Sequence, residues 1–424
     1  MRVHSTSSVR VLLINTSERA GGAAIAASRL TAALNRKGVK AKLLVRDKTT
    51  DSPTTVRLPQ RLRLRWAFLW ERVHIWAANG FTRKGLWDVD IAAAGADVTT
   101  LPEFREADII HLHWVNQGLL SMREIAKIVA SGKPVVWTMH DMWPCTAICH
   151  HARECDRFHS HCHDCPRLQR PGSHDLSWQV FERKAQAFAG GHITFVGCSQ
   201  WLTDEARKSA LLNGHQVVSI PNTFDSQLFH PVNEASRTAL RRQLGLPERR
   251  RLVLFACQKV TNEHKGLNYL VQALQSPTLA AMSEQVSVVV VGQMAESVAQ
   301  LIPFPVRTID YVHSEAMMAQ LYEAVDVFVT PSLEENLPNT IMEAMACGTP
   351  CVGFRIGGIP EMIDHKANGY VAAYRDAEGL AAGILFVLND HDRLTTAAAE
   401  KATRAWGEEQ VASEYRALFE SVIP

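Results

Sequence analysis

Two glutamates, Glu335 and Glu343, stand eight positions apart in the stretch EENLPNTIMEAMACGTP, residues 334–350. Pro338 suits the first turn of a helix and Gly348 suits its end, so the spacing predicts Glu335 in a loop and Glu343 inside a short helix. Apolar runs at residues 326–330 and 351–354 predict buried strands on either side. In an open parallel sheet the loops at the carboxyl ends of strands carry the ligand, and a helix N-terminus there favours a phosphate. We therefore interpret the stretch as a phosphate site flanked by carboxylates.

Two lysines, Lys259 and Lys265, follow another predicted strand, residues 252–256. They precede a helix that is expected to begin at Gly266, and two cations at such a place could neutralise a diphosphate. A solvated charged loop is the alternative, because most lysines are exposed. Together with the glutamates, the lysines form a consistent set: cations for a leaving diphosphate, a helix terminus for its oxygens, and a carboxylate able to hold a ribose diol.

Two further candidates follow strand-like runs nearer the N-terminus. Gly21 and Gly22 open a helix of small residues after residues 11–15, and paired glycines let a backbone approach a ligand closely. The full dinucleotide-binding fingerprint is absent, so a plain turn is the alternative. His140 and Asp141 directly follow residues 135–138, at the expected carboxyl end of a central strand, where a ligand would bind. A histidine satisfied by loop contacts is the alternative there.

Strand-like and helix-like runs alternate along the chain, which predicts parallel sheets built from βα units. The 424 residues exceed the usual size of one core, so two domains are expected. Residues 219–231, with prolines near both ends, are typical of an interdomain connection. Residues 406–423 repeat apolar side chains at helical spacing. The expected strands are 11–15, 41–45, 108–112, 135–138 and 193–197 in one series, and 252–256, 286–291, 326–330 and 351–354 in the other.

The composition narrows the class of protein. Hydrophobic residues make up 46% and charged residues 21%, which is typical of a globular chain and excludes a mainly disordered one. A formal net charge of +2 gives no argument for a nucleic-acid partner. The apolar runs are far shorter than a bilayer-spanning helix, and the first is too short for a signal peptide. A cytoplasmic protein is therefore expected.

A basic and aromatic stretch lies between residues 57 and 84. This composition fits a helix lying in an anionic membrane interface, on the inner face of the cytoplasmic membrane. An amphipathic helix packed on its own domain is the alternative. The basic residues are Arg57, Arg61, Arg63, Arg65, Arg72, Arg83 and Lys84, set against Glu71 and interleaved with Trp66, Phe68, Leu69, Trp70, Ile75 and Trp76.

A Cys/His-rich segment follows His140, between residues 145 and 165. A cytoplasmic location disfavours stable disulfides, which leaves metal binding or free thiols. Cys162 and Cys165 have the spacing of a zinc half-site, and Cys149 with Cys155 could complete four thiolates, although their gap is longer than usual. Such a closed structural site would fix the loop after His140 and would not supply a Lewis acid. The segment also holds Cys145 and the alternative ligands His150, His151, His159, His161 and His163.

Taken together, these motifs resemble the retaining glycosyltransferase family 4 of the glycosyltransferase-B fold. The resemblance covers nearly the whole chain, and two further stretches, HLHWVNQGLLS and WTMHDMWPCTAICHHARECDRFHSHCHDCP, are similar to the branch that makes bacterial exopolysaccharides of the colanic-acid type. It rests on PSLEENLPNTIMEAMACGTPCVGF, on Lys259 and Lys265 before Gly266, on Gly21-Gly22, on His140-Asp141 and on IPNTFDSQLFHP.

The resemblance implies an α/β protein with two Rossmann-like domains facing a cleft. Residues 1–215 would form the acceptor-side domain, residues 216–405 the nucleotide-sugar domain, and residues 406–424 a helix crossing back to the first domain. It implies transfer of a hexose from a UDP- or GDP-sugar to a glycan or lipid-linked oligosaccharide in surface polysaccharide synthesis. The departing phosphate would help accept the acceptor's proton, and no catalytic metal would be required.

The resemblance also implies a role for each candidate residue. Glu343 would hold the ribose hydroxyls, while Glu335 and His140 would contact the donor sugar. Lys259 and Lys265 would bind the diphosphate, although the family often has arginine where Lys259 stands, and lysine gives up bidentate phosphate binding. The backbone amides around Leu337, Asn339 and Thr340 would help to bind the diphosphate. Gly21 and Gly22 would border the diphosphate and the acceptor.

Two other functions stay open on the sequence alone. One is a sugar-nucleotide epimerase or hydrolase on the same two-domain scaffold, because a fold does not fix an activity. The other is a non-catalytic scaffold protein stabilised by zinc. Asp88 and Asp90 superficially resemble a metal-binding pair of the other transferase fold, but such acids are mostly solvated, so they are predicted to lie at the surface with no role.

Overall fold

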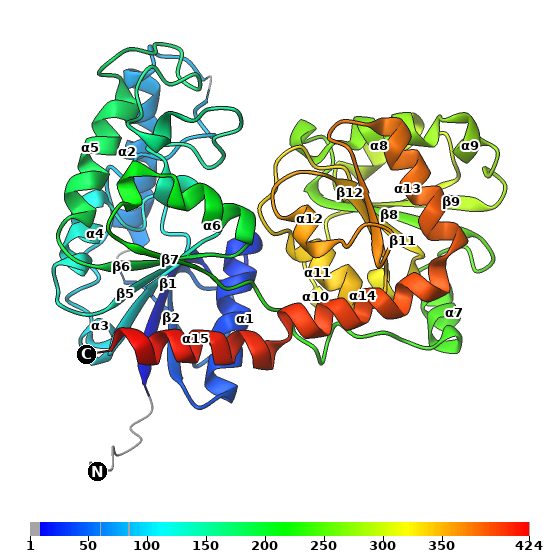
Figure 1. Ribbon diagram of the computed structural model, residues 1–424, viewed down its shortest axis with the longest axis horizontal. Helices are drawn as coiled ribbons and strands as arrows, with labels where there is room; N and C mark the ends of the chain where they lie inside the picture. The colour runs from blue at the N-terminus through cyan, green and yellow to red at the C-terminus, as the bar shows by residue number, and fades with distance from the viewer. Residues whose placement is uncertain (1–8, 60, 84, 424) are drawn as a thin grey trace. The chain divides into compact units, whose positions relative to one another are not determined.

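The computed structural model describes residues 9–59, 61–83 and 85–423, and it divides into two compact units (Figure 1). Unit 1 is Met1–Asn222 together with Val411–Pro424, and unit 2 is Thr223–Gln410. Lys84 of the predicted basic stretch lies outside the described residues. Among the helices that are described, none has the length and unbroken hydropathy that a bilayer crossing requires.

Unit 1 is built on a parallel sheet. Over the described residues, its strands are β1 (Arg10–Ser17), β2 (Lys40–Asp47), β3 (Thr55–Arg57), β4 (Ile109–Leu112), β5 (Val135–Met139), β6 (Ile193–Gly197) and β7 (Gln216–Ser219). They lie side by side in the order β3-β2-β1-β4-β5-β6-β7. The order of the strands along the chain reverses between β1 and β4, so the carboxyl ends of these two strands form the switch point where ligands bind in such sheets.

Alternate residues of these strands face two separate cores. One core gathers Leu12, Leu112 and Trp137 with the helices of one face. The other gathers Val11, Leu13 and Val136 with α1 and α15, whose Tyr415 and Phe419 are buried there, so the C-terminal helix packs on unit 1 (Figure 1). The helices of this unit are α1 (Gly22–Arg36), α2 (Arg61–Ala78), α3 (Pro102–Glu106), α4 (Met122–Val129), α5 (Leu176–Phe188), α6 (Gln200–Arg207) and α15 (Glu408–Val422), with 3₁₀ turns η1 (Trp143–Cys145), η2 (Arg157–His159) and η3 (Ala210–Leu212).

Unit 2 repeats the plan with a second parallel sheet. Its described strands are β8 (Arg251–Lys259), β9 (Val286–Gln293), β10 (Val306–Ile309), β11 (Val327–Thr330), β12 (Cys351–Phe354) and β13 (Gly369–Ala372), in the order β10-β9-β8-β11-β12-β13. Here the reversal falls between β8 and β11. The helices are α7 (Glu234–Gln243), α8 (Leu267–Leu274), α9 (Pro277–Ala280), α10 (Glu315–Ala324), α11 (Asn339–Ala346), α12 (Ile359–Met362), α13 (Ala377–Asn389) and α14 (His391–Trp406), with 3₁₀ turns η4 (Glu263–Lys265) and η5 (Ala295–Leu301).

The predicted fold class, two Rossmann-like α/β domains, is confirmed, and every predicted strand is present with small changes of bounds. The predicted division between residues 215 and 216 differs from the observed one, because residues 216–219 form β7 and pair with β6 in the first sheet. The C-terminal helix begins at Glu408 and not at Trp406, since Gly407 is extended and ends α14.

Candidate functional site

The loops that follow β8 and β11 meet at the switch point of unit 2. Lys265 ends η4 after β8, and Glu335 lies in the loop after β11, as the sequence predicts. The structure brings the two together: Lys265 Nζ lies 2.5 Å from Glu335 Oε1. The charge of Glu335 raises the pKa of Lys265 above its ordinary value, although burial opposes the shift. Lys265 is therefore a fixed cation at the place where this class of sheet binds its ligand.

Two glycines make this approach sterically possible. Gly266 has a φ of +71°, and a Cβ on it would lie 1.8 Å from the carbonyl oxygen of Pro331. Gly357 has a φ of +53°, and a Cβ there would lie 1.8 Å from the carbonyl oxygen of Glu335. No side chain fits at either position, so the loops on both sides of Glu335 are held by direct backbone contact.

Backbone hydrogen bonds tie the same loops together. The amide of Leu333 donates to the carbonyl of His264 over 2.8 Å, which links the loop after β11 to the loop after β8. The amide of Gly358 donates to the carbonyl of Asn336 over 2.8 Å, which links it to the loop after β12. Three loops from three adjacent strands thus form one network around Glu335.

Glu343 lies in helix α11, which directly follows the loop that contains Glu335. The helix begins after Pro338, as predicted, and has no side-chain cap at its N-terminus. Glu343 is 8% exposed, and Tyr322 Oη donates a hydrogen bond to its Oε2 over 3.4 Å. Leu337 is buried just before the helix, and Asn339 and Thr340 form its half-buried first turn, where helical amides and dipole favour an anion.

Lys259 differs from Lys265. It is the last residue of β8, with an exposed side chain, and over the described part of the chain that side chain makes no hydrogen bond or ion pair. Only one of the two predicted lysines is therefore held in place by the protein itself.

In unit 1, Gly21 and Gly22 follow β1 at the switch point of the first sheet. Gly21 has a φ of +91° and caps α1, and a Cβ on it would meet no atom within 4 Å. The turn that precedes it is held by Glu18, whose carboxylate accepts hydrogen bonds from the amides of Thr49 at 2.6 Å and Thr50 at 2.8 Å. Burial opposes ionisation of Glu18, but hydrogen bonds from Thr50 and Thr49 lower its pKa to about 2.

His140 follows β5, the strand next to β4. Its Nε2 lies 3.0 Å from Nδ1 of His113, which follows β4 at the switch point. Burial lowers the pKa of His140 to about 4, and burial and two neighbouring histidines lower the pKa of His113 well below its ordinary value. Both imidazoles are therefore neutral at pH 7. Asp141 accepts from Trp114 Nε1 at 2.9 Å, and burial raises its pKa, but His150 and backbone contacts lower it to about 2.

Sequence reasoning gave no role to His113 and Trp114, which lie closer to the switch point than His140. Trp114 reaches β1, because its amide donates to Asn15 Oδ1 over 2.9 Å. The sequence did offer a signal for these two residues: a histidine and a tryptophan directly follow the predicted strand 108–112. In the structure this strand, β4, pairs with β1.

The prediction that Asp88 and Asp90 form a solvated surface pair is wrong for Asp90. Asp90 is 3% exposed, forms an ion pair with Arg72 of α2, and accepts from His150 Nε2 at 2.8 Å. His150 Nδ1 in turn lies 2.7 Å from Asp141 Oδ2. Asp90 is thus a buried link between α2 and the loop that carries His140.

Comparisons with known proteins match each half of the chain separately. A family described as Glycosyltransferase Family 4 matches residues 20–228, and one described as Glycosyl transferases group 1 matches residues 250–390. A stretch of 109 residues is 33% identical to the N-acetyl-alpha-D-glucosaminyl L-malate synthase of Bacillus anthracis and covers 25% of this chain and 29% of that protein. A stretch of 86 residues is 40% identical to an amylovoran biosynthesis glycosyltransferase of Erwinia amylovora and covers 19% of this chain and 21% of that one. The chain thus spans less than a third of the length of these two relatives.

Among solved structures, the fold is similar to HepE from Anabaena in complex with UDP-glucose. The two align with a TM-score of 0.62 and 17% sequence identity over 97% of this chain and 99% of the other. The chain is thus similar to family 4 glycosyltransferases over residues 20–228 and to group 1 glycosyl transferases over residues 250–390, and its two Rossmann-like sheets share the fold of HepE.

Proposed function

We propose that this protein is a retaining glycosyltransferase that moves a hexose from a UDP- or GDP-sugar to a glycan or lipid-linked oligosaccharide, in bacterial surface polysaccharide synthesis. The observation that carries the proposal is the Lys265–Glu335 pair at the switch point of unit 2, beside the uncapped N-terminus of α11. The UDP-glucose in the HepE structure and the amylovoran biosynthesis in the name of the Erwinia relative support the choice of donor and pathway.

The proposed site divides the donor among residues of unit 2. Glu343 holds the ribose diol, since the two oxygens of a carboxylate can accept hydrogen bonds from two hydroxyls. Lys265 and the first turn of α11, with Lys259 at the rim, bind the diphosphate. Glu335 contacts the hexose, and His140 and Gly21-Gly22 of unit 1 serve the sugar and the acceptor.

The proposed reaction replaces one bond at the anomeric carbon with another on the same face. The bond from this carbon to the phosphate oxygen breaks, the acceptor oxygen bonds to the carbon, and the acceptor proton passes to the departing phosphate. Negative charge gathers on the diphosphate as the bond breaks, so a fixed cation and helix dipole there lower the barrier most. Lys265 and α11 provide that charge in this proposal, and turnover is expected not to require added magnesium or manganese.

A donor panel tests the proposal. Full-length protein is given UDP- and GDP-hexoses with and without lipid-linked and free oligosaccharide acceptors, and release of UDP or GDP is measured with the anomeric configuration of the product. The proposal requires acceptor-dependent release and a retained configuration. Release of UDP or GDP at the same rate without acceptor would identify a hydrolase. Conversion of the sugar nucleotide into another sugar nucleotide would identify an epimerase. Absence of nucleotide binding in calorimetry would identify a scaffold protein.

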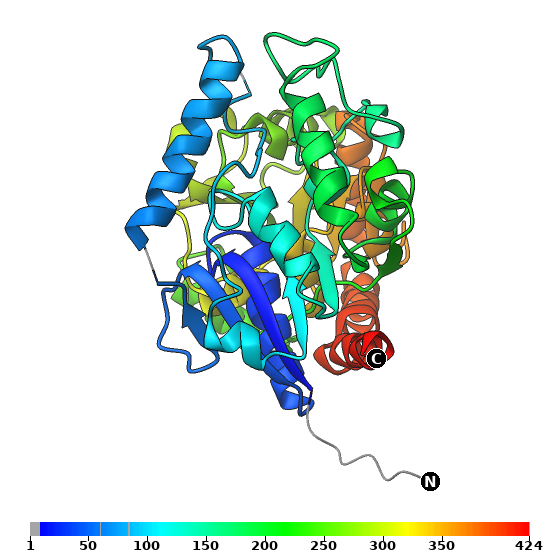
Figure 2. The same cartoon turned by 90° about the vertical axis from the view of Figure 1, so that its left-hand side faces the viewer.

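The membrane proposal concerns helix α2, which runs along the flank of unit 1 (Figure 2). Leu64 and Ile75 on its inner side are fully buried in the core, so the helix does pack on its own domain. Its outer side nevertheless exposes a second apolar stripe, at i, i+4, i+7, i+8 spacing. The exposed fractions are 72% for Leu62, 70% for Trp66, 50% for Leu69, 60% for Trp70, 51% for Val73 and 39% for Trp76.

We propose that this stripe lies in the interface of an anionic bilayer on the cytoplasmic side. Exposed tryptophans favour the headgroup region, and Arg63 and Arg65 on the same helix are complementary to anionic lipid. An open groove of about 490 Å³ beside the stripe is lined by Arg63, Trp66, Trp70 and Arg123 among others. Its chemistry suits the polar end of a lipid-linked acceptor, which would bring the acceptor to unit 1.

Vesicle co-sedimentation tests the membrane proposal. Full-length protein should sediment with vesicles of phosphatidylcholine and phosphatidylglycerol, less with phosphatidylcholine alone, and less at high salt. Replacing Trp66 and Trp70 with serine should abolish sedimentation, whereas Tyr374→Ser, which removes an exposed aromatic residue of unit 2, should leave it unchanged. Equal recovery in the supernatant with and without anionic vesicles at low salt would refute the proposal.

A further inference from the structure

The Cys/His-rich segment has almost no regular structure of its own. Between η1, which ends at Cys145, and α5, which begins at Leu176, the described chain forms a single 3₁₀ turn, η2. Loops of this length are uncommon in compact domains, because few of their backbone groups are paired internally. Such a segment is usually fixed by a cross-link, and the cysteines here are all free thiols in the described chain.

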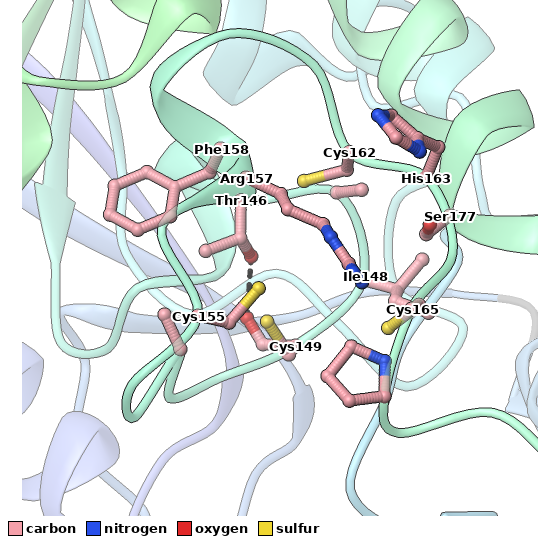
Figure 3. A pocket seen from close by; sticks show the side chains of 13 residues that line it. Thr146, Ile148, Cys149, Cys155, Arg157, Phe158, Cys162, His163, Cys165 and Ser177 are labelled. Atoms are coloured by element: carbon pink, nitrogen blue, oxygen red, sulfur yellow. Dashed lines mark hydrogen bonds between the residues drawn. The ribbon is translucent and has the colours of Figure 1, made fainter. Parts of the chain in front are cut away.

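Four of the five cysteines in the segment face one cavity. Cys149, Cys155, Cys162 and Cys165 line a space of about 20 Å³, and Figure 3 shows their sulfur atoms directed toward it from different turns. That volume is close to what one water molecule occupies. Cys145 does not line the cavity: it is fully buried elsewhere, and its Sγ donates to the carbonyl of Met142. The structure therefore selects the same four thiols whose spacing the sequence singled out.

Three of the five histidines of the segment are engaged in other contacts. Both ring nitrogens of His150 face carboxylates, Asp141 at 2.7 Å and Asp90 at 2.8 Å. Both ring nitrogens of His161 are also occupied, by the carbonyl of Cys162 at 3.0 Å and by Glu182 at 2.8 Å. His163 lines the cavity, but its Nδ1 lies 2.8 Å from the carboxylate of Asp164.

Two cations accompany the thiols. Arg157 lines the cavity (Figure 3). Its guanidinium donates to the carbonyl of Asp164. Lys184 is fully buried, lies 3.4 Å from the ring centroid of Trp143, and is within electrostatic reach of Cys149 and Cys162. Within the described residues, its ammonium group has carbonyls and a ring as partners and no carboxylate at ion-pair distance. Burial lowers the pKa of Lys184 to about 7, so negative charge nearby, such as a thiolate, would favour its protonated form.

We propose that Cys149, Cys155, Cys162 and Cys165 bind one structural zinc ion as four thiolates. Binding forms four sulfur–zinc bonds and releases the four thiol protons to solvent, which leaves a site of net charge −2 that Arg157 and Lys184 offset. In the described residues no three His, Cys, Asp or Glu side chains already stand in metal-binding geometry, so the four sulfur atoms, which face the cavity, must move closer together when the ion binds. Four protein ligands leave no position for substrate, so the ion is a structural element.

The zinc would position the loop that carries His140. Cys149 directly precedes His150, and His150 is bonded to Asp141, the neighbour of His140. The carbonyl of Cys149 also accepts a hydrogen bond from Thr146 Oγ1 at 2.6 Å (Figure 3). Fixing Cys149 therefore fixes the hydrogen-bonded chain from the segment to the switch point of unit 1.

Elemental analysis of untagged, full-length protein tests the proposal directly. About one zinc per chain is expected, and a mercurial that reacts with thiols should release it from the native protein, as followed with a zinc dye. Cys162→Ser with Cys165→Ser should lose the metal and lower the melting temperature. Cys145→Ala and Cys198→Ala, which remove buried thiols away from the cavity, should retain the zinc.

The ligand set has its own test. Protein reconstituted with cobalt(II) should show the visible and sulfur-to-metal bands of a tetrahedral tetrathiolate, and His163→Ala should leave the spectrum unchanged. Loss of metal in His163→Ala would replace the four-cysteine assignment with a mixed site. Metal-free native protein in which the four thiols are freely alkylated, or in which mass analysis finds them joined as disulfides, would overturn the proposal.

Discussion

The switch points of the two sheets are held in different ways. In unit 2 the loops around Glu335 touch through backbone, with Gly266 and Gly357 allowing contacts that no side chain would permit. In unit 1 the corresponding loops are held by buried polar side chains, Glu18 on the turn before Gly21 and His113 against His140. The loops at the switch point of unit 2 therefore depend on glycines, which have no side chain. The loops at the switch point of unit 1 depend on the protonation state of buried side chains.

This difference has consequences for what each unit tolerates. Backbone contacts do not titrate, so the geometry around Lys265 should persist over a wide pH range but fail when a glycine is replaced. Buried imidazoles and carboxylates keep their geometry only in one charge state. The switch point of unit 1 should therefore respond to pH where the switch point of unit 2 does not.

The largest effect is expected from Lys265→Ala. It removes the fixed cation at the switch point of unit 2, where the proposed leaving group gains charge, so turnover should fall by roughly 10²-fold or more. Because the loops are held by backbone, the melting temperature should change little. The measurement is kcat with the donor identified in the panel.

The matched control is Lys208→Ala. Lys208 forms an ion pair of the same type with Glu205, 2.6 Å apart, on α6 of unit 1. Its loss should leave kcat unchanged, since exposed helix pairs contribute little. Near-normal turnover by a folded Lys265→Ala protein would contradict both the proposed site and the view that unit 2 is preorganised.

A smaller but still clear effect is expected from Gly266→Ala. The new Cβ would lie 1.8 Å from the carbonyl oxygen of Pro331, so the loops after β8 and β11 must separate, with donor affinity falling roughly tenfold and stability by roughly 2–4 kcal/mol. Calorimetric donor binding and urea unfolding measure the two effects.

Gly245→Ala separates the steric effect from the conformational one. Gly245 also has a positive φ, +65°, but a Cβ there would meet no atom within 4 Å. Alanine should cost only about 1–2 kcal/mol of backbone strain at this position and leave donor binding intact. Equal losses in both variants would show that backbone contact is not what holds the loops of unit 2.

The strands at the two switch points were predictable, but the edges of the sheets were not. The four strands that the sequence missed, β3, β7, β10 and β13, are the outermost strands of the two sheets. They are short, and three of them are largely half-exposed, so they lack the unbroken apolar run that marked the central strands. The missed strand β7 is also the reason that the predicted domain boundary lay too early.

Sequence patterns placed the site residues at strand ends but could not pair them. Lys265 and Glu335 contact each other because β8 and β11 are neighbours, although β9 and β10 lie between them in the chain. The same holds for His113 and His140 across β4 and β5. Asp90 was misjudged because its burial depends on Arg72 and His150, which come from distant segments.

An intermediate effect is expected from mild acid at the switch point of unit 1, where buried histidines lie close together. Burial lowers the pKa of His111 to about 3 and of His140 to about 4, below the ordinary value of about 6.5. A histidine whose folded pKa is depressed contributes stability that is present above its unfolded pKa and is lost as pH falls. Lowering the pH from 7 to 5 should therefore weaken unit 1, while Asp141, with a pKa of about 2, stays ionised.

Hydrogen exchange resolves this effect by region. Peptides covering β4 and β5 of unit 1 should lose protection between pH 7 and 5, after correction for the intrinsic exchange rate, whereas peptides covering β11 and the loop to α11 should not. Uniform loss of protection in both units, or none in either, would remove the distinction between the two switch points.

The smallest effect is expected from Tyr322→Phe, which tests how firmly unit 2 holds Glu343. The hydrogen bond from Tyr322 Oη to Glu343 is long, 3.4 Å, and the ring is packed against Phe328 independently of the hydroxyl, with centroids 5.6 Å apart. Losing the hydroxyl should raise the KM for the donor a few-fold and leave kcat nearly unchanged, since Glu343 is proposed to bind the ribose and not the reacting carbon.

Tyr415→Phe is the matched control: it removes a buried hydroxyl that lies 2.7 Å from Thr138 Oγ1 in unit 1, and it should lower stability by about 1 kcal/mol without changing the donor KM. A fall in kcat with an unchanged KM in Tyr322→Phe would place Glu343 at the reacting centre instead of at the ribose.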